Sequence, residues 1–500
     1  MNKMNPNPLS LLVMLITFAL SSTLVLAQKE GIDKAIERAE ALSHFKFLAS
    51  DELKGRDPAR PEIDIAAYYI ANQFEKYGAS PLNSLNAYYQ YVPFVASSPP
   101  TVGSMKWKGS KFKHGQDLLV LGGDDISGEF EMVVAGYGFE EDYANKDVKG
   151  KWVIVRVGAP NRMTPTELFK AGREKLAIAK SQGAIGLVEM YNVPTTPWGL
   201  LVNYLNKSQL TIDIDPENDD TLPYLWLKDL KGDIIKTIAN GKNEMEIDIK
   251  GKINRKIRGR NVVAVIEGTD PQLKDEYVML SAHYDHLGIG KPNAEGDSIY
   301  NGARDNAVGT SALLQAANYF GKNPPKRSIL LCAWTAEEKG LLGSSYFADN
   351  PPLPLKQIVF NLNIDNGGYN DTSLVTVIGM GRSSVDHHIS EAAKAYGLKA
   401  ISDPAPEQGL YDRSDNVSFA KKGIPAPTFS LGFTAFDAEI GKYYHQVTDH
   451  VDNFDLDYAL KYWKSYILSA ESIANDPKKP LWVEGDKYEN AAKELYGKDY

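Results

Sequence analysis

Residues 281–288 read Ser-Ala-His-Tyr-Asp-His-Leu-Gly, and residues 301–306 read Asn-Gly-Ala-Arg-Asp-Asn. A short apolar run before the first motif has the length of a buried strand, and an apolar pattern of helical period follows the second motif. His283 and Asp285 are therefore expected where a strand ends, and Asp305 where a helix begins. In open α/β sheets, ligands bind outside the carboxyl ends of the strands. The stretch indicates a metal site, with an acidic surface loop as the alternative.

The chain around this stretch alternates between strand and helix. From Asn261 onward, apolar runs of strand length occur at 262–266, 278–282, 328–334 and 358–364, and helical patterns separate the later ones. This alternation predicts an α/β domain with a doubly wound, mixed and mainly parallel sheet. Its last helix is predicted over residues 456–475.

The middle of the chain has a different pattern of predicted helices and strands. Between about Gly109 and Lys250, strand-like runs recur with one clear helix among them, and no histidine-plus-carboxylate constellation appears. A chain of 500 residues is long enough for two or three domains. We therefore predict that this stretch is a separate, β-rich domain with a packing or recognition role.

Composition and the N-terminus bear on partners and compartment. The formal net charge of −9 argues against nucleic-acid binding, which requires basic patches. Lys3, the apolar run 11–20 and the small residues before position 28 predict a signal peptide over residues 1–27. A membrane anchor is disfavoured because Ser-Ser-Thr at 21–23 interrupts the apolar run. The single cysteine, Cys332, excludes an intrachain disulfide, a thiolate metal cluster and a lipid anchor near the cleavage site. We expect an exported protein, periplasmic or secreted, without a membrane span in the mature chain.

Polar residues gather at successive strand ends in the second half of the chain. They are His283 and Asp285, then Asp305, Glu337 and Glu338, Asp365, and His445 in a later loop. Carboxylates placed together in this way repel one another unless a cation compensates. Three carboxylate ligands and one hydroxide balance two divalent cations, and imidazole with carboxylate suits zinc. The sequence therefore predicts a pair of metal ions.

Individual roles follow from position. Asp305, at the start of a helix, is placed to bridge the two ions. Glu337 and Glu338 are adjacent and point in different directions, so that one can bind metal while the other acts as a general base on water. Asp285 lies two residues from His283 and can orient its imidazole. His286 and His450 are expected around the ligands or at the surface.

The motifs together resemble the zinc aminopeptidases of metallopeptidase family twenty-eight, in the subgroup with an inserted protease-associated (PA) domain. The matching pieces are residues 282–288, 301–306, 335–338, 363–365, 414–415, 423–425 and 444–449, and the segment 47–56 resembles the N-terminal part of this subgroup. The resemblance implies a zinc held by His283 and Asp365, a second zinc held by Glu338 and His445, and Asp305 as the bridge. It also implies Glu337 as general base and Asp285 as support for His283. The resemblance further implies that a PA domain over residues 109–252 is inserted into a discontinuous catalytic domain over residues 28–108 and 253–500.

The same resemblance implies the substrate. It is a peptide with a free N-terminus, and Tyr444 matches a position that some relatives place against the oxyanion. Three alternatives stay open: a carboxypeptidase that releases glutamate, for which Arg413 or Arg304 would supply a basic pocket, a glutaminyl cyclase with one zinc, and a non-catalytic receptor-like relative. The side-chain preference and the oligomeric state do not follow from the sequence.

Overall fold

The computed structural model describes residues 27–85, 87–161, 165–193, 196–213, 222–239 and 244–498, except for the side chains of residues 165 and 166. Apart from Ala27, the expected signal peptide lies outside these residues. The chain divides into two compact units. Unit 1 comprises residues 1–92 and 258–500, and unit 2 comprises residues 93–257. The expected insert, residues 109–252, falls within unit 2, which extends beyond it at both ends.

Unit 1 is built on a mixed sheet. Its strands, in spatial order, are β18 (Lys399–Ser402), β17 (Leu374–Ile378), β19 (Thr428–Leu431), β16 (Ile358–Ile364), β12 (Tyr277–His283), β15 (Ser328–Trp334), β11 (Ile253–Ile266) and β1 (Tyr89–Ser98). The central strand β12 runs parallel to both neighbours, β15 and β16, and β16 runs parallel to β19. β11 and β17 pair antiparallel with β15 and β19. The predicted mixed, mainly parallel α/β sheet is confirmed.

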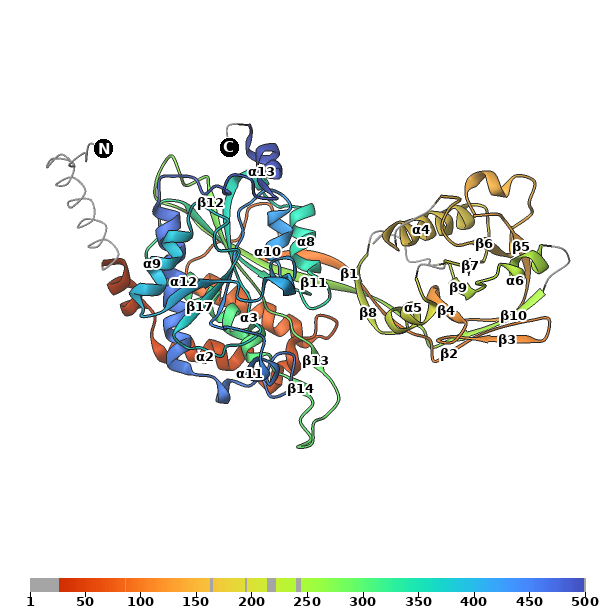
Figure 1. Ribbon diagram of the computed structural model, residues 1–500, viewed down its shortest axis with the longest axis horizontal. Helices are drawn as coiled ribbons and strands as arrows, with labels where there is room; N and C mark the ends of the chain where they lie inside the picture. The colour runs from red at the N-terminus through yellow and green to blue at the C-terminus, as the bar shows by residue number, and fades with distance from the viewer. Residues whose placement is uncertain are drawn as a thin grey trace, which may run out of the picture. The chain divides into compact units, whose positions relative to one another are not determined.

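Helices cover both faces of this sheet (Figure 1). One face packs against α2 (Arg38–Leu48), α3 (Glu62–Lys76), α7 (Val308–Phe320), α9 (Asp386–Ala395) and α12 (Leu456–Asn475). The other face packs against α8 (Leu342–Asp349), α10 (Asn416–Ala420) and α13 (Glu489–Tyr496). Alternate residues of each central strand enter alternate cores: Leu331 faces the first core, and Leu330 and Cys332 face the second. Strands buried on both faces explain the continuous apolar runs of the sequence.

Unit 1 also has several short elements. They are β13 (Gly288–Ile289), β14 (Ile299–Tyr300) and α11 (Ala438–Gly441), with the turns η1 (Asp51–Arg56), η3 (Ala303–Ala307), η4 (Leu355–Gln357), η5 (Pro406–Gln408), η6 (Leu410–Asp412) and η7 (Val451–Asn453). The predicted helix start at Asp305 is slightly displaced, because α7 itself begins at Val308. Asp305 lies in η3 with non-helical backbone angles, and its peptide bond to Asn306 is cis.

Unit 2 has a sheet of its own. Its strands, in spatial order, are β3 (Ser110–Lys113), β2 (Val102–Trp107), β10 (Glu244–Lys250), β5 (Ile126–Val134), β6 (Trp152–Arg156), β7 (Gly186–Tyr191), β9 (Tyr224–Lys228) and β4 (Leu118–Gly122). β8 (Gln209–Ile212) pairs antiparallel with residues 94–97 of β1. The remaining elements are α4 (Pro165–Ser181), α5 (Trp198–Leu205), α6 (Asp233–Ile238) and η2 (Glu140–Tyr143). Two apolar clusters pack this unit, so it has its own core.

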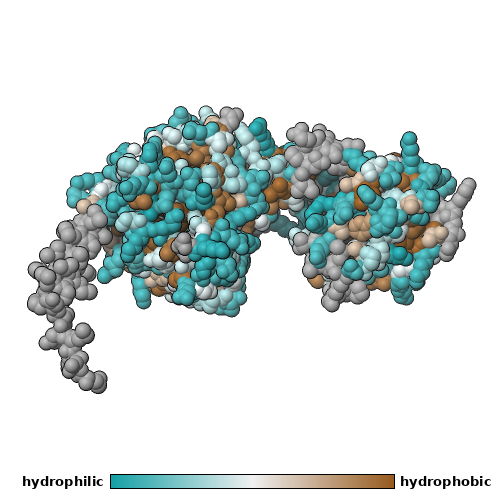
Figure 2. Space-filling view, turned by 90° about the horizontal axis from the view of Figure 1, so that it is seen from above, coloured by the Kyte–Doolittle hydropathy of each residue, from teal (hydrophilic) through white to brown (hydrophobic). Residues whose placement is uncertain are grey.

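The surface of unit 1 has both polar and apolar areas. The face of unit 1 drawn in Figure 2 is mostly hydrophilic, with smaller apolar areas between the polar ones. Across the residues that the structure describes, no helix combines the length and apolar character required for a membrane span.

Candidate metal centre

The carboxyl ends of the parallel strands bring the predicted residues together. His283 is the last residue of β12 and lies opposite Trp334, the last residue of β15. The β15 end leads into Glu337 and Glu338, and the β16 end leads into Asp365. The loop before α7 supplies Asp305, and the loop after α11 supplies His445. Parallel pairing in register places these ends at one edge of the sheet, as the sequence pattern predicts.

The first group of possible ligands surrounds the His283 imidazole. Its Nε2 atom lies 3.1 Å from Oδ1 of Asp365 and 3.2 Å from Oδ1 of Asp305. The three side chains are largely removed from solvent, with His283 only 1% exposed. Burial opposes protonation of His283, but the carboxylates of Asp365 and Glu337 raise its pKa well above the usual value. One imidazole nitrogen and two carboxylate oxygens thus lie close enough together to bind the same metal ion.

The second group uses the other oxygen of Asp305. Nε2 of His445 lies 3.1 Å from Oδ2 of Asp305 and 3.4 Å from Oε2 of Glu338. His445 has a positive φ of 55°, a left-handed conformation that is costly for a residue with a Cβ. Asp305 therefore faces one histidine with each carboxylate oxygen. Although burial alone would raise the pKa of Asp305, its contacts with His283 and His445 hold it well below its usual value.

His286 also enters this group. Its Nδ1 atom lies 2.7 Å from Oε1 of Glu338, on the oxygen that His445 does not approach, and 4.0 Å from Oδ2 of Asp305. The side chain is fully buried, which rules out the surface position that was one of the two expectations for His286. Since nitrogen donates to carboxylate, His286 is placed to orient Glu338.

Asp285 is held by the loop after β15. Its Oδ1 atom accepts a hydrogen bond from the backbone N–H of Glu337 at 3.0 Å, and Oδ2 accepts one from Glu338 at 3.3 Å. Nδ1 of His283 lies closer to the carbonyl oxygen of Asp285, at 3.2 Å, than to its carboxylate, at 3.7 Å. The residue thus contacts the predicted imidazole chiefly through its backbone, and its carboxylate fixes the two glutamates.

Two further carboxyl groups, of Glu337 and Asp415, interact with the centre. Burial raises the pKa of Glu337 well above its usual value, and the carboxylates of Asp365, Asp415 and Glu338 act in the same direction. Asp415 is fully buried, and its pKa is raised to about 7, with burial as the largest cause. Asp415 lies within one of the matching motifs, but no role was predicted for it. No spacing signal distinguishes it, because only the fold brings it to the centre.

Arg304 is not available to bind a substrate carboxylate. Its side chain is 3% exposed, and Nη1 donates to Oδ1 of Asp449 at 2.8 Å. The guanidinium also lies over the ring of Tyr443, 3.7 Å from its centroid. Oδ2 of Asp449 accepts from the backbone N–H groups of Arg304 and Asp305. The prediction that Arg304 could supply a basic pocket for a substrate carboxylate is therefore wrong. Its guanidinium is buried against Asp449, which also accepts hydrogen bonds from the backbone of the Asp305 loop.

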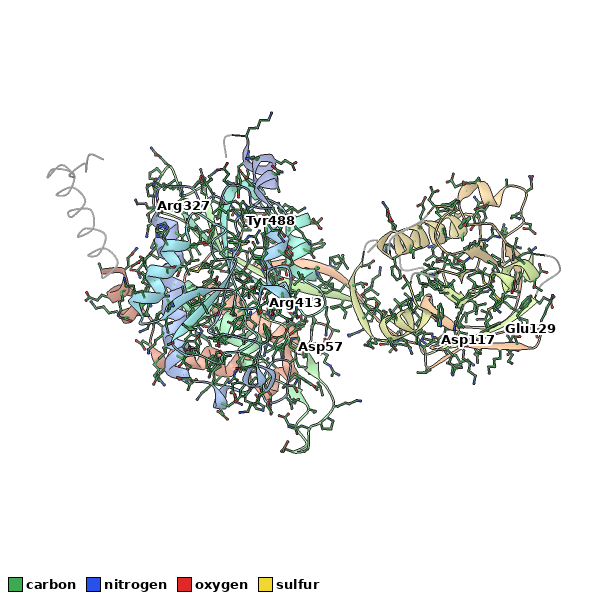
Figure 3. All side chains as sticks on the ribbon, viewed as in Figure 1. Asp57, Asp117, Glu129, Arg327, Arg413 and Tyr488 are labelled. Atoms are coloured by element: carbon green, nitrogen blue, oxygen red, sulfur yellow. The ribbon has the colours of Figure 1, made fainter. Side chains whose placement is uncertain are left out.

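A pocket of about 500 Å³ opens beside the carboxylates. Asp305, Glu337, Glu338, Asp365 and His445 form one part of its wall. The apolar part consists of Leu341, Ile378, Leu410, Phe433, Phe436, Ile440 and the ring of Tyr444. Tyr444 stacks on His445 with ring centroids 4.0 Å apart. Arg413 also lines the pocket, and Figure 3 labels it on unit 1.

The donor set fits divalent cations. In each of two groups, His283 with Asp305 and Asp365, and His286 with Asp305 and Glu338, the possible ligand atoms lie within 4.8 Å of one another. Carboxylates this close require positive charge between them, and mixed imidazole and carboxylate donors suit zinc.

A third group, His387, His388 and Asp476, lies nearer the surface, where His388 hydrogen-bonds Asp476 at 2.9 Å. His388 is partly buried there, whereas His387 is exposed.

The chain is similar in part to known peptidases. Residues 261–469 match the model of peptidase family M28. Aminopeptidase YwaD of Bacillus subtilis (strain 168) is 25% identical over 327 residues, covering 64% of this chain and 61% of that protein. Leucine aminopeptidase 2 of Arthroderma otae is 26% identical over 305 residues, covering 56% of each chain. The matches thus span less than two thirds of these curated relatives.

One solved structure supports the fold. The aminopeptidase from Aneurinibacillus sp. strain AM-1 superposes with a TM-score of 0.50 at 20% identity, covering 92% of this chain and 99% of that one. At this identity the likeness concerns the architecture alone.

Proposed function

Since residues 261–469 belong to peptidase family M28, we propose that the protein is an exported zinc aminopeptidase that removes N-terminal residues from peptides. The observation that carries the proposal is Asp305, whose two carboxylate oxygens each face a histidine and a second carboxylate. The relatives named above are aminopeptidases in name, which favours this peptidase activity over others.

We assign the ligands by their contacts. His283 and Asp365 would hold one zinc ion, Glu338 and His445 would hold the second, and Asp305 would be shared. His286 would orient Glu338 through the oxygen that His445 leaves free. When bound, zinc ions supply Lewis acidity that activates water and polarises a carbonyl.

We assign the transfer of the water proton to a residue of the protein, Glu337. Glu337 lines the pocket beside the ligands and is not itself needed as one, so its carboxylate accepts a proton from the attacking water. The same oxygen returns the proton to the nitrogen of the leaving peptide. The backbone of Glu337 is fixed by Asp285, which keeps the base directed at the pocket. The ring of Tyr444 stacks on His445, and we assign its phenolic hydroxyl as the donor to the developing oxyanion.

The pocket wall supports a substrate class. Seven apolar or aromatic side chains line the space next to the acidic cluster, which favours an apolar N-terminal side chain. Arg413 lines the same pocket, and a guanidinium there suits a carboxylate of a short substrate. Arg413 is also the observation that keeps a glutamate-releasing carboxypeptidase as the second candidate.

Unit 2 and the N-terminus complete the proposal. We propose that residues 109–252 are a PA domain without a catalytic part, since the described residues there offer no cluster of metal ligands. We propose residues 1–27 as a signal peptide on the sequence pattern alone.

A substrate panel with and without a chelator tests the activity. Nitroanilides of leucine, phenylalanine, glutamate and lysine are compared with N-acetyl-leucine nitroanilide, glutaminyl peptides and a peptide ending in glutamate. We expect hydrolysis of the leucine and phenylalanine compounds, no hydrolysis of the acetylated one, and loss of activity with the chelator. Release of C-terminal glutamate from an N-acetylated peptide, or cyclisation of glutaminyl peptides, would replace the proposal by one of its alternatives.

A further inference from the structure

Arg56 is a buried arginine whose hydrogen bonds all go to backbone carbonyls. It is 1% exposed. Nε donates to the carbonyl of Tyr284 at 2.7 Å, Nη1 to that of Asn301 at 2.6 Å, and Nη2 to that of Gly302 at 3.0 Å. Nη1 also donates to the carbonyl of Leu48, the last residue of α2. One planar guanidinium thus joins three segments that are distant in sequence.

Two of these segments carry the candidate metal centre. Tyr284 lies between His283 and Asp285, and Asn301 and Gly302 directly precede the η3 turn that carries Asp305. The backbone of Arg56 adds a further contact, because its carbonyl accepts from the N–H of His286 at 3.1 Å. The distance between the β12 end and the Asp305 loop is therefore set in part by a residue from the N-terminal segment.

The turn that delivers Arg56 is an unusual one. Lys54, Gly55 and Arg56 all have positive φ, at 47°, 69° and 52°. Such angles are unfavourable for a residue with a Cβ and persist only where the surrounding structure imposes them. A Cβ on Gly55 would lie 2.4 Å from the carbonyl oxygen of Gly288, so the turn packs closely against β13.

The charge of Arg56 is buried near several carboxylates of the centre. Burial lowers its pKa to about 10, and the carboxylates of Asp305, Asp285, Asp449 and Glu338 oppose this shift. Arg56 thus stays cationic at neutral pH, while its donors are taken up by neutral carbonyls. A buried charge is costly without compensation. Its compensation therefore comes from the carboxylates of the candidate centre.

We propose that Arg56 is a positioning residue of the metal centre, holding the Asp305 loop in register with His283 through its hydrogen bonds to both segments. This inference rests on the proposed function. The simpler alternative is that Arg56 only anchors the N-terminal segment to the fold. That alternative predicts a loss of stability with no change in metal affinity.

Another buried arginine provides a matched control. Arg327, at the opposite end of β15 from Glu337, is also 1% exposed. Its Nε donates to Glu276 at 2.8 Å, and its Nη groups donate to the carbonyls of Asp476 and Pro477. Figure 3 labels Arg327 and Arg413, the latter at the pocket, well apart within unit 1. Arg327→Lys therefore disturbs a comparable network away from the centre.

The test measures zinc affinity in the full chain by competition with a chromophoric chelator, together with melting temperatures with and without zinc. Arg56→Lys keeps the charge and loses the planar fork, and Arg56→Met loses both. We expect Arg56→Lys to weaken zinc binding by about 10–100-fold, Arg56→Met to weaken it further, and Arg327→Lys to lower the melting temperature with unchanged zinc affinity.

The outcomes separate the two proposals. Wild-type zinc affinity in Arg56→Lys overturns the role of Arg56, whatever its melting temperature. If Arg56→Met does not fold, the comparison of Arg56→Lys with Arg327→Lys decides. A wild-type protein that binds no zinc would remove the proposed function itself, and with it this inference.

Discussion

The backbone N–H of Glu337 donates a 3.0 Å hydrogen bond to Oδ1 of Asp285. The two residues come from the ends of neighbouring parallel strands, β15 and β12, so this bond ties the proposed base to the segment of the proposed ligand His283. Oδ2 of the same carboxylate accepts from Glu338. A single buried carboxylate thus sets the position of two glutamates with different proposed roles.

Replacing Asp285 by asparagine tests this arrangement. The amide has one acceptor oxygen, so its NH₂ group faces a backbone N–H that was previously bonded. We expect Asp285→Asn to lower zinc affinity and kcat/KM by about 10–100-fold each, measured by chelator competition and by leucine nitroanilide hydrolysis.

Asp371→Asn is the control for that substitution. Asp371 is partly exposed, accepts a 2.8 Å hydrogen bond from the backbone N–H of Ser373 and does not line the pocket. It should leave both quantities unchanged. Equal effects of the two substitutions would show that Asp285 has no special part in the site.

Glu337→Gln separates proton transfer from metal binding. Glutamine keeps the volume of the side chain but accepts no proton, so we expect kcat to fall about 10²–10⁴-fold while the metal content per chain persists. Metal analysis and kinetics on the same preparation provide both readings. Full turnover in this variant would assign the base to another residue.

A buried carboxyl away from the centre gives a pH dependence. Glu471, in α12, accepts a hydrogen bond from the hydroxyl of Tyr319 at 3.0 Å, and burial raises its pKa from 4.5 to about 7. The folded state therefore binds this proton more tightly than the unfolded state. The stabilising contribution of protonated Glu471 is complete below pH 4.5 and is lost as the pH rises to about 7.

Glu471→Gln should remove this loss. We expect the melting temperature of the variant, relative to wild type, to be higher at pH 8 than at pH 5 by a few degrees. Glu295→Gln, at an exposed position, should show no such difference. A pH-independent offset for Glu471→Gln would mean that the carboxyl is ionised throughout.

The sequence predicted the sheet well because hydrophobic runs of strand length have few other interpretations. β15 and β16 occupy the predicted residues 328–334 and 358–364, and α12 occupies 456–475. The strand-end residues could be predicted to converge because parallel strands share one edge. Contacts that depend on turns could not be predicted. The inward position of Arg56, the carboxylate bonds of Asp285 and the burial of Arg304 against Asp449 all depend on loop conformations that leave no periodic signal.

Metal content per chain tests the central claim most directly. The account holds that Asp305 is shared by two ions, since its two oxygens face His283 and His445 separately. Protein purified without chelator, loaded with zinc and dialysed exhaustively is analysed for zinc by mass spectrometry against protein concentration from amino-acid analysis. Two zinc ions per chain in the wild type are predicted. A content of one zinc ion or none would contradict the account.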